Sequence, residues 1–217
     1  MKRYLMAGLI ASLALAFGLA PSAGASVASK GKPKNTKAEN ALINNHVPPN
    51  TASSCQGDTK QEKASLIKDF PSQKSHINAI AAAVQCFPTA QGSPDVVYYV
   101  QMATLNDLLD LYQANLTFYN VPGGPGPSKD ASGNTAGPTS TTCPLENTWG
   151  PPAPGGGGGT NSPVGRVICE PSTSSHSGDL VWTQEPLKIY SEAFVKTDPT
   201  GSLLLSFFQG ADSGPEG

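Results

Sequence analysis

The segment 96–119, VVYYVQMATLNDLLDLYQANLTFY, contains the clearest strand and the clearest helix of the chain. At its start apolar side chains recur with period two on one face, and the other face is also largely apolar. We therefore expect a strand at Val96–Met102 that is covered on both sides. Thr104 follows as an N-cap, with Asp107 three residues later as an acidic variant of the capping box. The pattern predicts a helix over Thr104–Tyr119 directly after the strand.

This helix has one apolar stripe. Its expected members are Leu105, Leu108, Leu109, Tyr112, Leu116 and Tyr119. Such a stripe favours a core contact with a sheet over a ligand-binding surface. On the polar side, we interpret Asp107 and Asp110 as partners of the helix dipole rather than as paired glycosidase carboxylates. The sequence Asn115-Leu116-Thr117 fits a glycosylation acceptor, but it lies within the apolar helix and we discount it.

The C-terminal part of the chain predicts a three-stranded antiparallel meander and a closing helix. We expect strands at Val164–Glu170, Leu180–Thr183 and Leu187–Val195, the last two joined by a tight turn at Glu185-Pro186. Asp198-Pro199 predicts an N-cap with proline at the first helical position. The apolar residues that this last helix can bury are Leu203, Leu204, Phe207 and Phe208.

The N-terminal part of the chain has weaker patterns. Lys37–Ile43 can form one or two helical turns before the prolines at 48 and 49, and Glu62–Phe70 is a second short helical candidate. Ile77–Phe87 is ambiguous, because its run of alanines favours helix whereas Val84–Phe87 suits a strand. We interpret the latter part as a strand.

The first residues have the features of an export signal. Met1-Lys2-Arg3 gives a positive start, residues 5–20 are an almost unbroken apolar run, and Ala23-Gly24-Ala25 is a small-x-small pattern of the kind that signal peptidases cleave. We expect residues 1–25 to be a signal peptide. The mature chain would then begin near Ser26, outside the cytoplasm.

The alternative for this segment is a membrane anchor, because its length of about 16 residues approaches the roughly 20 that a spanning helix needs. Cleavage is favoured, since the run is short and leads directly into the small-residue site and a polar stretch. No later segment is long and apolar enough to cross a bilayer. We expect no stable membrane span after cleavage.

Four cysteines follow the export signal, at Cys55, Cys86, Cys143 and Cys169. Outside the cytoplasm thiols oxidise and persist as disulfides, so the even number predicts two disulfides. A structural zinc site would need two short-spaced pairs, and here all four cysteines lie far apart. The three histidines are equally scattered, and we expect neither a metal nor a cofactor.

Composition divides the mature chain into one core-forming region and three stretches that bury little. We expect 26–41 to be a solvated basic tail, with loose attraction to anionic envelope polymers as the weaker alternative. The Gly/Pro-rich insert 121–163 cannot recover its ordering entropy through burial and is expected to be a flexible linker. With a disordered tail at 211–217, residues 42–210 then form a single domain of ordinary size.

Charge restricts the class of partner. Without Lys2 and Arg3 the mature chain has 12 basic and 16 acidic side chains, a net charge of −4 with His neutral. Most basic residues precede Ser75 and most acidic residues follow it. A basic lead on an acidic body lacks the concentrated positive face that nucleic acid requires. We expect a monomer that binds no nucleic acid and whose partner is an unidentified extracellular ligand or envelope component.

Two patterns suggest chemistry, and both have ordinary explanations. Residues 174–179 contain Ser, His and Asp, but adjacency in sequence is not a catalytic triad, and a turn explains the composition. Trp149 and Trp182 could line a carbohydrate surface, although each is more often a core or loop anchor. Together with Arg166 they form the candidate binding surface, and no catalytic residue is expected.

A series of short features then suggests a family. In chain order they are Leu42–Pro48 as an opening leucine-to-proline turn, Cys55, the strand ending at Cys86, the strand–helix pair Val97–Phe118, Cys143, Trp149, Gly165–Cys169 as a Gly-Arg-apolar-x-Cys strand, and Leu180–Thr183 as an apolar-x-Trp-Thr strand. In this order they resemble a small extracytoplasmic domain of actinobacteria, found at the outer end of serine/threonine protein kinases and as stand-alone exported proteins. Phe207-Phe208 departs from the pair of tryptophans usual in that family.

The resemblance implies an α+β fold with disulfides Cys55–Cys86 and Cys143–Cys169. It implies no established catalysis, and the kinase-linked members are regarded as sensors. The Gly-rich loop, the Ala-x-Lys strand and the His-Arg-Asp loop of a kinase are absent from this sequence. We therefore expect the chain to correspond to the outer module alone.

These expectations combine into one prediction. The fold is α+β, with a small antiparallel sheet, one main packed helix, a C-terminal helix and two disulfides. The function is that of a secreted, non-catalytic binding or sensor-like module, extracellular or associated with the cell envelope, and not an enzyme. The alternative is a small secreted hydrolase or cell-wall-acting enzyme whose catalytic residues the sequence does not reveal.

Overall fold

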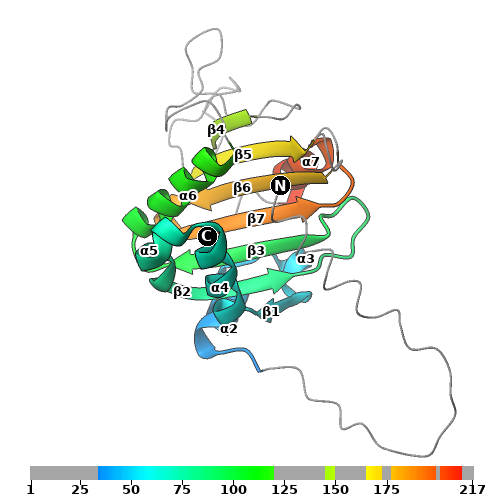
Figure 1. Ribbon diagram of the computed structural model, residues 1–217. Coiled ribbons are helices and arrows are strands. Elements are labelled where there is room, and N and C mark those ends of the chain that lie inside the picture. The colour runs from blue at the N-terminus through cyan, green and yellow to red at the C-terminus, as the bar shows by residue number, and fades with distance from the viewer. Residues whose placement is uncertain (1–33, 120–144, 150–164, 173–176, 199–200, 212–217) are drawn as a thin grey trace, which may run out of the picture. The chain divides into compact units, whose positions relative to one another are not determined.

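A computed structural model describes residues 34–119, 145–149, 165–172, 177–198 and 201–211 (Figure 1). All described residues belong to one compact unit, which begins at Lys34. The expected signal peptide at 1–25 and residues 212–217 of the expected tail 211–217 lie outside the described residues and stay predictions, whereas Ala211 is the last residue of a helix, Ser202–Ala211.

The centre of the unit is one antiparallel sheet of seven strands, in the order β1-β2-β3-β7-β6-β5-β4. The strands are β1 (Cys55–Gly57), β2 (Ile80–Cys86), β3 (Val96–Met102), β4 (Leu145–Trp149), β5 (Gly165–Ser172), β6 (Ser177–Gln184) and β7 (Ile189–Val195). Every neighbouring pair is antiparallel. The C-terminal strand β7 inserts beside β3, so the two parts of the chain on either side of the insert share one sheet.

Helices cover both faces of this sheet. They are α2 (Lys37–His46), α3 (Pro49–Ala52), α4 (Thr59–Asp69), α5 (Lys74–Asn78), α6 (Leu105–Tyr119) and α7 (Ser202–Ala211), with the short 3-10 turns η2 (Pro71–Gln73) and η3 (Glu185–Leu187). In Figure 1, α4, α5 and α6 lie on the face toward the viewer, and α7 lies on the far face. The expected α+β class and antiparallel sheet are confirmed, although more than one helix packs on the sheet.

The strand β3 has the residue bounds expected from the sequence, and both of its faces are buried. Val97 and Tyr99 belong to one hydrophobic cluster, together with side chains of α2 and α7. Val100 and Met102 belong to the other cluster, together with side chains of α4, α5 and α6. The strand therefore separates two cores, as the apolar residues on both of its faces predict.

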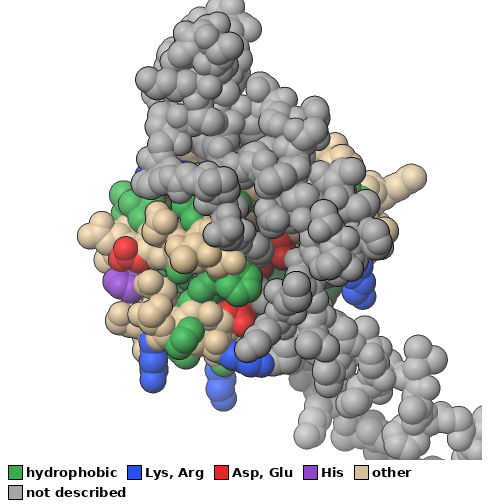
Figure 2. Space-filling view, turned by 45° about the horizontal axis from the view of Figure 1, so that its top comes forward, with side chains coloured by type: hydrophobic (Ala, Val, Ile, Leu, Met, Phe, Trp, Pro, Cys, Tyr) green, Lys and Arg blue, Asp and Glu red, His purple; other side chains and the backbone are tan. Residues whose placement is uncertain are grey.

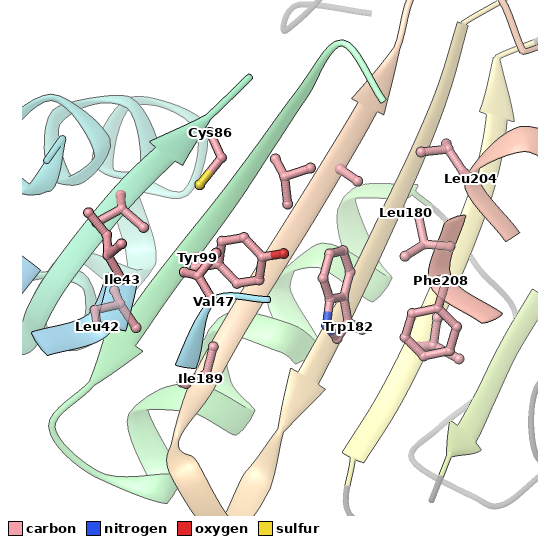
Figure 3. Packing of buried hydrophobic residues seen from close by; sticks show 14 of the residues in the cluster. Leu42, Ile43, Val47, Cys86, Tyr99, Leu180, Trp182, Ile189, Leu204 and Phe208 are labelled. Carbon is pink, nitrogen blue, oxygen red and sulfur yellow. The ribbon is translucent and has the colours of Figure 1, made fainter. Parts of the chain in front are cut away.

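The far-face core is built around Trp182, which is 2 % exposed (Figure 3). Its ring makes edge contacts with Tyr99, at 6.0 Å between ring centroids, and with Phe208 of α7, at 5.8 Å. Leu42, Ile43 and Val47 fill the same cluster from the α2 side. Edge-to-face contacts of this kind add to the free energy gained by burying the rings.

The helix α6 begins as expected, but its buried stripe differs from the expected one. The Thr104 hydroxyl accepts from the Asp107 amide at 3.1 Å and donates to the Asp107 carboxylate at 2.6 Å, which confirms the cap. The buried positions are Leu108, Leu111, Tyr112, Asn115 and Leu116. Leu105 is 40 % exposed and Leu109 is half-buried. The expected stripe was thus wrong at these two leucines, because the buried positions follow the helical spacing of three and four from Leu108 onward.

The ambiguous segment Ile77–Phe87 divides at Ala79. Lys74–Asn78 is the helix α5, and the alanines after it belong to β2, which runs to Cys86. Ala82 and Ala83 are both 0 % exposed, since each packs under one of the two helical layers. Small side chains let both layers approach the strand closely, so the helical propensity of alanine does not decide the structure.

Two expected boundaries need correction. The helix α2 starts at Lys37, inside the segment expected to be a solvated tail, and Glu39 is only 6 % exposed. The insert 121–163 contains β4, which pairs in register with β5 from Leu145 to Trp149. A capping residue and a ladder of backbone hydrogen bonds order these segments, and neither is visible in overall composition. The remainder of the insert lies outside the described residues.

The C-terminal meander is confirmed, whereas the last helix starts later than expected. The three strands are β5, β6 and β7, with η3 at the expected tight turn. Helix α7 begins at Ser202 rather than at Pro199, which lies outside the described residues. Asp198 is therefore not the residue directly before the helix, but its carboxylate still accepts from an amide of the first turn, that of Leu204, at 3.0 Å. Leu204 and Phe208 are buried as expected.

Candidate functional site

The residues expected to form a binding surface do not lie together on one. Trp182 is a core residue, so its assignment to a surface was wrong. Arg166 is half-buried on β5, and its Nε donates to the Glu185 carboxylate at 2.9 Å. Trp149 ends β4, and its backbone pairs with Gly165. Arg166 is therefore held by a neighbour within the fold, and this contact is sufficient to explain its position.

The disulfide Cys55–Cys86 joins β1 to β2, where the two residues are direct cross-strand partners. This part of the expected pairing is confirmed. Cys86 is fully buried and Cys55 is half-buried. The second expected disulfide depends on Cys143, which lies outside the described residues, so the Cys143–Cys169 pairing stays a prediction.

A group of ionisable side chains surrounds Tyr98 on the α4–α6 face of the sheet. Gln85, Tyr98 and Glu192 form a row across β2, β3 and β7, because they are aligned cross-strand partners. The Gln85 amide donates to the Tyr98 hydroxyl at 2.6 Å. Burial and the negative charges of Glu62, Glu192 and Asp58 all raise the pKa of Tyr98, which keeps the phenol neutral. We name Asp58, Glu62, Gln85, Tyr98 and Glu192 the Tyr98 cluster.

Glu192 has a further hydrogen bond within this group. The Tyr190 hydroxyl donates to the Glu192 carboxylate at 3.0 Å, and both residues are buried. Glu62 of α4 is also buried, with 5 % of its surface exposed. Three carboxylates and two phenols thus converge from α4, β3, β7 and the residue before α4. Such a set suits a cationic group, which carboxylates attract through charge and aromatic rings through their faces.

Next to this cluster, Glu39 joins the first turns of α2 and α4. Its carboxylate accepts from the Thr36 amide at 2.7 Å and from the Thr59 amide and hydroxyl at 3.1 and 2.6 Å. Burial acts to raise the pKa of Glu39, but the hydrogen bonds from Thr59 and Thr36 outweigh it, and the pKa falls below its usual value. The carboxylate is therefore charged at neutral pH.

Asp58 directly precedes Thr59, whose amide and hydroxyl donate to the Glu39 carboxylate. It is the N-cap residue of α4, but its side chain makes no capping hydrogen bond. Burial, and then repulsion by Glu39, raises the pKa of Asp58 to about 6. Among the described residues its carboxylate has no hydrogen bond or ion pair.

A second group, at the exposed end of α5, consists of His76, Asp107 and Asp110. His76 Nδ1 lies 2.8 Å from Asp107 and its Nε2 lies 3.5 Å from Asp110. The pair His76–Asp107 is a contact that a general base would use. However, Nε2 faces a carboxylate, and no Ser, Thr or Cys of the described chain is bonded to His76. The arrangement therefore explains the docking of α5 on α6 rather than a catalytic step.

The exposed face of the helical layer has little concentrated charge. Figure 2 shows hydrophobic side chains, uncharged polar side chains and backbone over most of the visible described surface, with basic side chains along its lower edge. The most exposed large apolar side chains in the described segments are Phe87, Leu105 and Phe118. They come from different elements and from opposite ends of α6, so the described structure gives no reason to treat them as one patch.

Sequence analysis did not find the Tyr98 cluster. Its members are spread from residue 58 to residue 192, and the only local sign of it is Tyr98 on an otherwise apolar strand. The alternation at Val96–Met102 places Tyr98 on the α4–α6 face. However, no local sequence pattern predicts the strand order that brings Glu192 beside Tyr98. The Glu39 junction had one available signal, since Thr36 and Glu39 fit a capping box.

Within the described segments there is no group of three or more His, Cys, Asp or Glu residues that could hold a metal ion. Over the same segments, no helix combines the length and the apolar character needed to cross a membrane. The chain matches no protein family model, no curated protein and no solved structure. The resemblance to the actinobacterial extracytoplasmic domain therefore stays a prediction from the quoted residues.

Proposed function

We propose that this chain is a secreted, non-catalytic binding or sensor-like module of the bacterial cell envelope or medium. The observation that carries the proposal is the Tyr98 cluster. Two of its three carboxylates, Asp58 and Glu62, lie at the start of α4, and the fold brings Glu192 of β7 beside Tyr98 on the same face of the sheet. Gathering like charges in a largely buried place costs free energy, and such sites are found more often where a ligand is bound.

The chemistry of the cluster favours a ligand with a cationic group. The body of the protein after Ser75 has 4 basic and 12 acidic residues, so its long-range field also attracts cations. The Gln85–Tyr98 hydrogen bond fixes the phenol beside the carboxylates. An amine or guanidinium group of an envelope component would therefore find both charge and an aromatic ring. Export, the second disulfide and the monomeric state belong to the same proposal.

The test is a titration of the mature chain, from Ser26 onward, followed by NMR. Spermidine serves as the cationic probe and an N-acetylglucosamine oligomer as the neutral one. We expect spermidine to shift the backbone amides of Gln85 and Tyr98, and Glu62→Gln to weaken this binding several-fold. Asp110→Asn is the matched control, because it removes an acidic charge from the separate His76 group.

Three results would contradict the proposal. The first is that spermidine shifts no amide of the Tyr98 cluster. The second is that Glu62→Gln does not weaken the binding of spermidine. The third is that Asp110→Asn weakens this binding as much as Glu62→Gln does. The last result would show attraction to overall negative charge rather than to a site. Preferential binding of the sugar oligomer at Gln85 and Tyr98 would contradict the cationic class of ligand while keeping the location.

A further inference from the structure

The first turns of α2 and α4 are joined by one side chain. The Glu39 carboxylate closes the capping box of α2 with Thr36, and it also accepts from the amide and the hydroxyl of Thr59. The Thr59 hydroxyl in turn accepts from the Ala83 amide of β2 at 2.9 Å. A single buried carboxylate thus connects α2, α4 and the sheet. We call this contact the α2–α4 junction.

The residues between β1 and α4 lie directly against this carboxylate. Gly57 is so close that a Cβ atom there would overlap Glu39. The Gly57 amide donates to the Asn35 side chain at 2.8 Å, which fixes the chain just before α2. Asp58 is flanked by Gly57 and Thr59 and is therefore a neighbour of Glu39 in space. Its backbone is held by the Ala83 carbonyl, so it cannot move away without breaking the pairing to β2.

The ionisable groups around Asp58 do not neutralise it. Glu39 faces it from α2, Glu62 follows it one turn later on α4, and Tyr98 faces it from β3. Of the lysines on α4, Lys60 and Lys68 are exposed, and Lys63 donates to the Asn78 carbonyl. Within the described chain no cation pairs with Asp58. The partly buried carboxylates of Glu39 and Asp58 repel each other, and protonation of Asp58 relieves this repulsion.

We propose that the α2–α4 junction is an acid-strengthened latch, in which protonation of Asp58 tightens the attachment of α2 and of the segment that enters it. Glu39 retains its hydrogen bonds because it is the better stabilised of the two carboxylates. With Asp58 protonated, its repulsion of Glu39 disappears and the junction closes more firmly. With Asp58 charged, the junction opens more often. This inference does not depend on the ligand of the Tyr98 cluster.

The direction of the pH effect on the junction follows from proton linkage. When the junction opens, water reaches Asp58 and its pKa returns toward the usual value of a free aspartate, whereas in the closed junction it is about 6. The closed form therefore binds the proton more tightly, and lowering the pH from 7.5 to 5 favours closure. The consequence for the domain is mechanical, because α2 holds Leu42 and Ile43 against the far-face core. The entry point of the N-terminal lead is thus fixed more firmly in mild acid.

Amide hydrogen exchange of the mature chain, read by NMR at pH 5 and 7.5, tests the latch. The reporter is the Thr59 amide, which donates to Glu39 in the closed junction. After correction for the intrinsic exchange rate at each pH, we expect its protection to rise on the order of 10-fold from pH 7.5 to pH 5. In Asp58→Asn the protection should be high at both pH values and nearly independent of pH.

Two further variants separate the latch from general effects of pH. Glu39→Gln should lower the protection of Thr59 at both pH values and reduce its pH dependence, because the repelling charge is gone. Asp110→Asn should keep the wild-type rise, since it lies in the His76 group. The proposal is overturned if wild type shows no rise, if Asp58→Asn keeps it, or if Asp110→Asn removes it.

Discussion

Gly57 provides the sharpest test of the α2–α4 junction. An alanine at this position would place its Cβ on the Glu39 carboxylate, which is buried and cannot move outward without leaving its partners. Those partners are the Thr36 amide, the Thr59 amide and the Thr59 hydroxyl, at 2.7, 3.1 and 2.6 Å. The substitution Gly57→Ala therefore exchanges a small gain in strand propensity for the loss of charge-assisted hydrogen bonds.

The loss of stability expected for Gly57→Ala follows from the hydrogen bonds that Glu39 would lose. A hydrogen bond to a charged group contributes about 1.5–3 kcal/mol, and a displaced carboxylate regains part of this from water. Losing one or two of the three bonds gives an expected cost of about 2–4 kcal/mol for Gly57→Ala. Glu39→Ala should cost a similar amount, since it removes both the cap of α2 and the contacts with Thr59.

A double-mutant cycle isolates the overlap. In the Glu39→Ala background a Cβ at residue 57 has room, so adding Gly57→Ala should cost less than about 1 kcal/mol, and the interaction energy should be about 2–3 kcal/mol. The free energies come from urea unfolding under non-reducing conditions. As a control, Gly92→Ala has open space around its Cβ but a φ of 81°, so it should cost about 1 kcal/mol and add independently to Glu39→Ala. Additive effects of Gly57→Ala and Glu39→Ala, within about 0.5 kcal/mol, would refute the assigned contact.

Three other predictions concern charge, packing and cross-linking. Asp58→Asn should raise the free energy of unfolding at pH 7, because burial and Glu39 hold the pKa of Asp58 at about 6, above its usual 3.8. The shift of about 2 units corresponds to an upper bound of about 3 kcal/mol at ~1.4 kcal/mol per unit, and screening at this half-exposed site reduces it to about 1–2 kcal/mol. A raised pKa means that the folded state binds the proton more tightly than the unfolded state. The difference in the free energy of unfolding between Asp58→Asn and wild type should therefore vanish as the pH falls from 6 to 4. The same difference at pH 4 as at pH 7 would show that the charge of Asp58 is not its cause. Leu111→Ala should cost about 2–5 kcal/mol in thermal or urea unfolding, whereas Leu105→Ala, at an exposed leucine of the same helix, should change stability by less than about 0.5 kcal/mol; similar costs would show that the buried stripe is misassigned. Replacing Cys55 and Cys86 together by Ser should cost about 3 kcal/mol, because the disulfide closes a loop with a sequence separation of 31 residues; peptide mapping that finds both thiols free in the oxidised wild type would remove the basis of this prediction.

Local sequence patterns were sufficient where a structural element depends on its own residues. The strand β3, the cap of α6 and the meander β5–β7 were all predicted, since alternation, capping and turn residues act within a few positions. The disulfide Cys55–Cys86 was implied by the family resemblance and is present. The stripe of α6 was only partly predicted, because Asn115 is buried in it although it is polar. Its side-chain nitrogen donates to the Leu111 carbonyl at 3.0 Å, a local bond that satisfies this end of the amide, whereas the buried Oδ1 has no hydrogen-bond partner among the described residues.

The candidate site could not be predicted in the same way. Trp182 was included in the candidate binding surface because it could line a carbohydrate surface, but it has the more common role of a core residue, since β6 is an interior strand and Tyr99 and Phe208 enclose the ring. Asp58 gave no sign of a raised pKa in the sequence, since the causes are its burial in the fold and then repulsion by Glu39, which lies 19 positions earlier. Glu192 faces Tyr98 only because β7 inserts beside β3.

The sequence by itself determined that this chain forms an α+β unit with an antiparallel sheet, since periodicity, caps and turns are properties of neighbouring residues. Only the tertiary structure decided that β7 pairs with β3, that α2 is part of the folded unit, and that Glu39 meets Asp58 across the start of α4. The physical reason is the range of the forces involved. Backbone preferences act over a few residues, whereas burial, repulsion and the pKa of a carboxylate depend on groups that the fold brings together from distant positions.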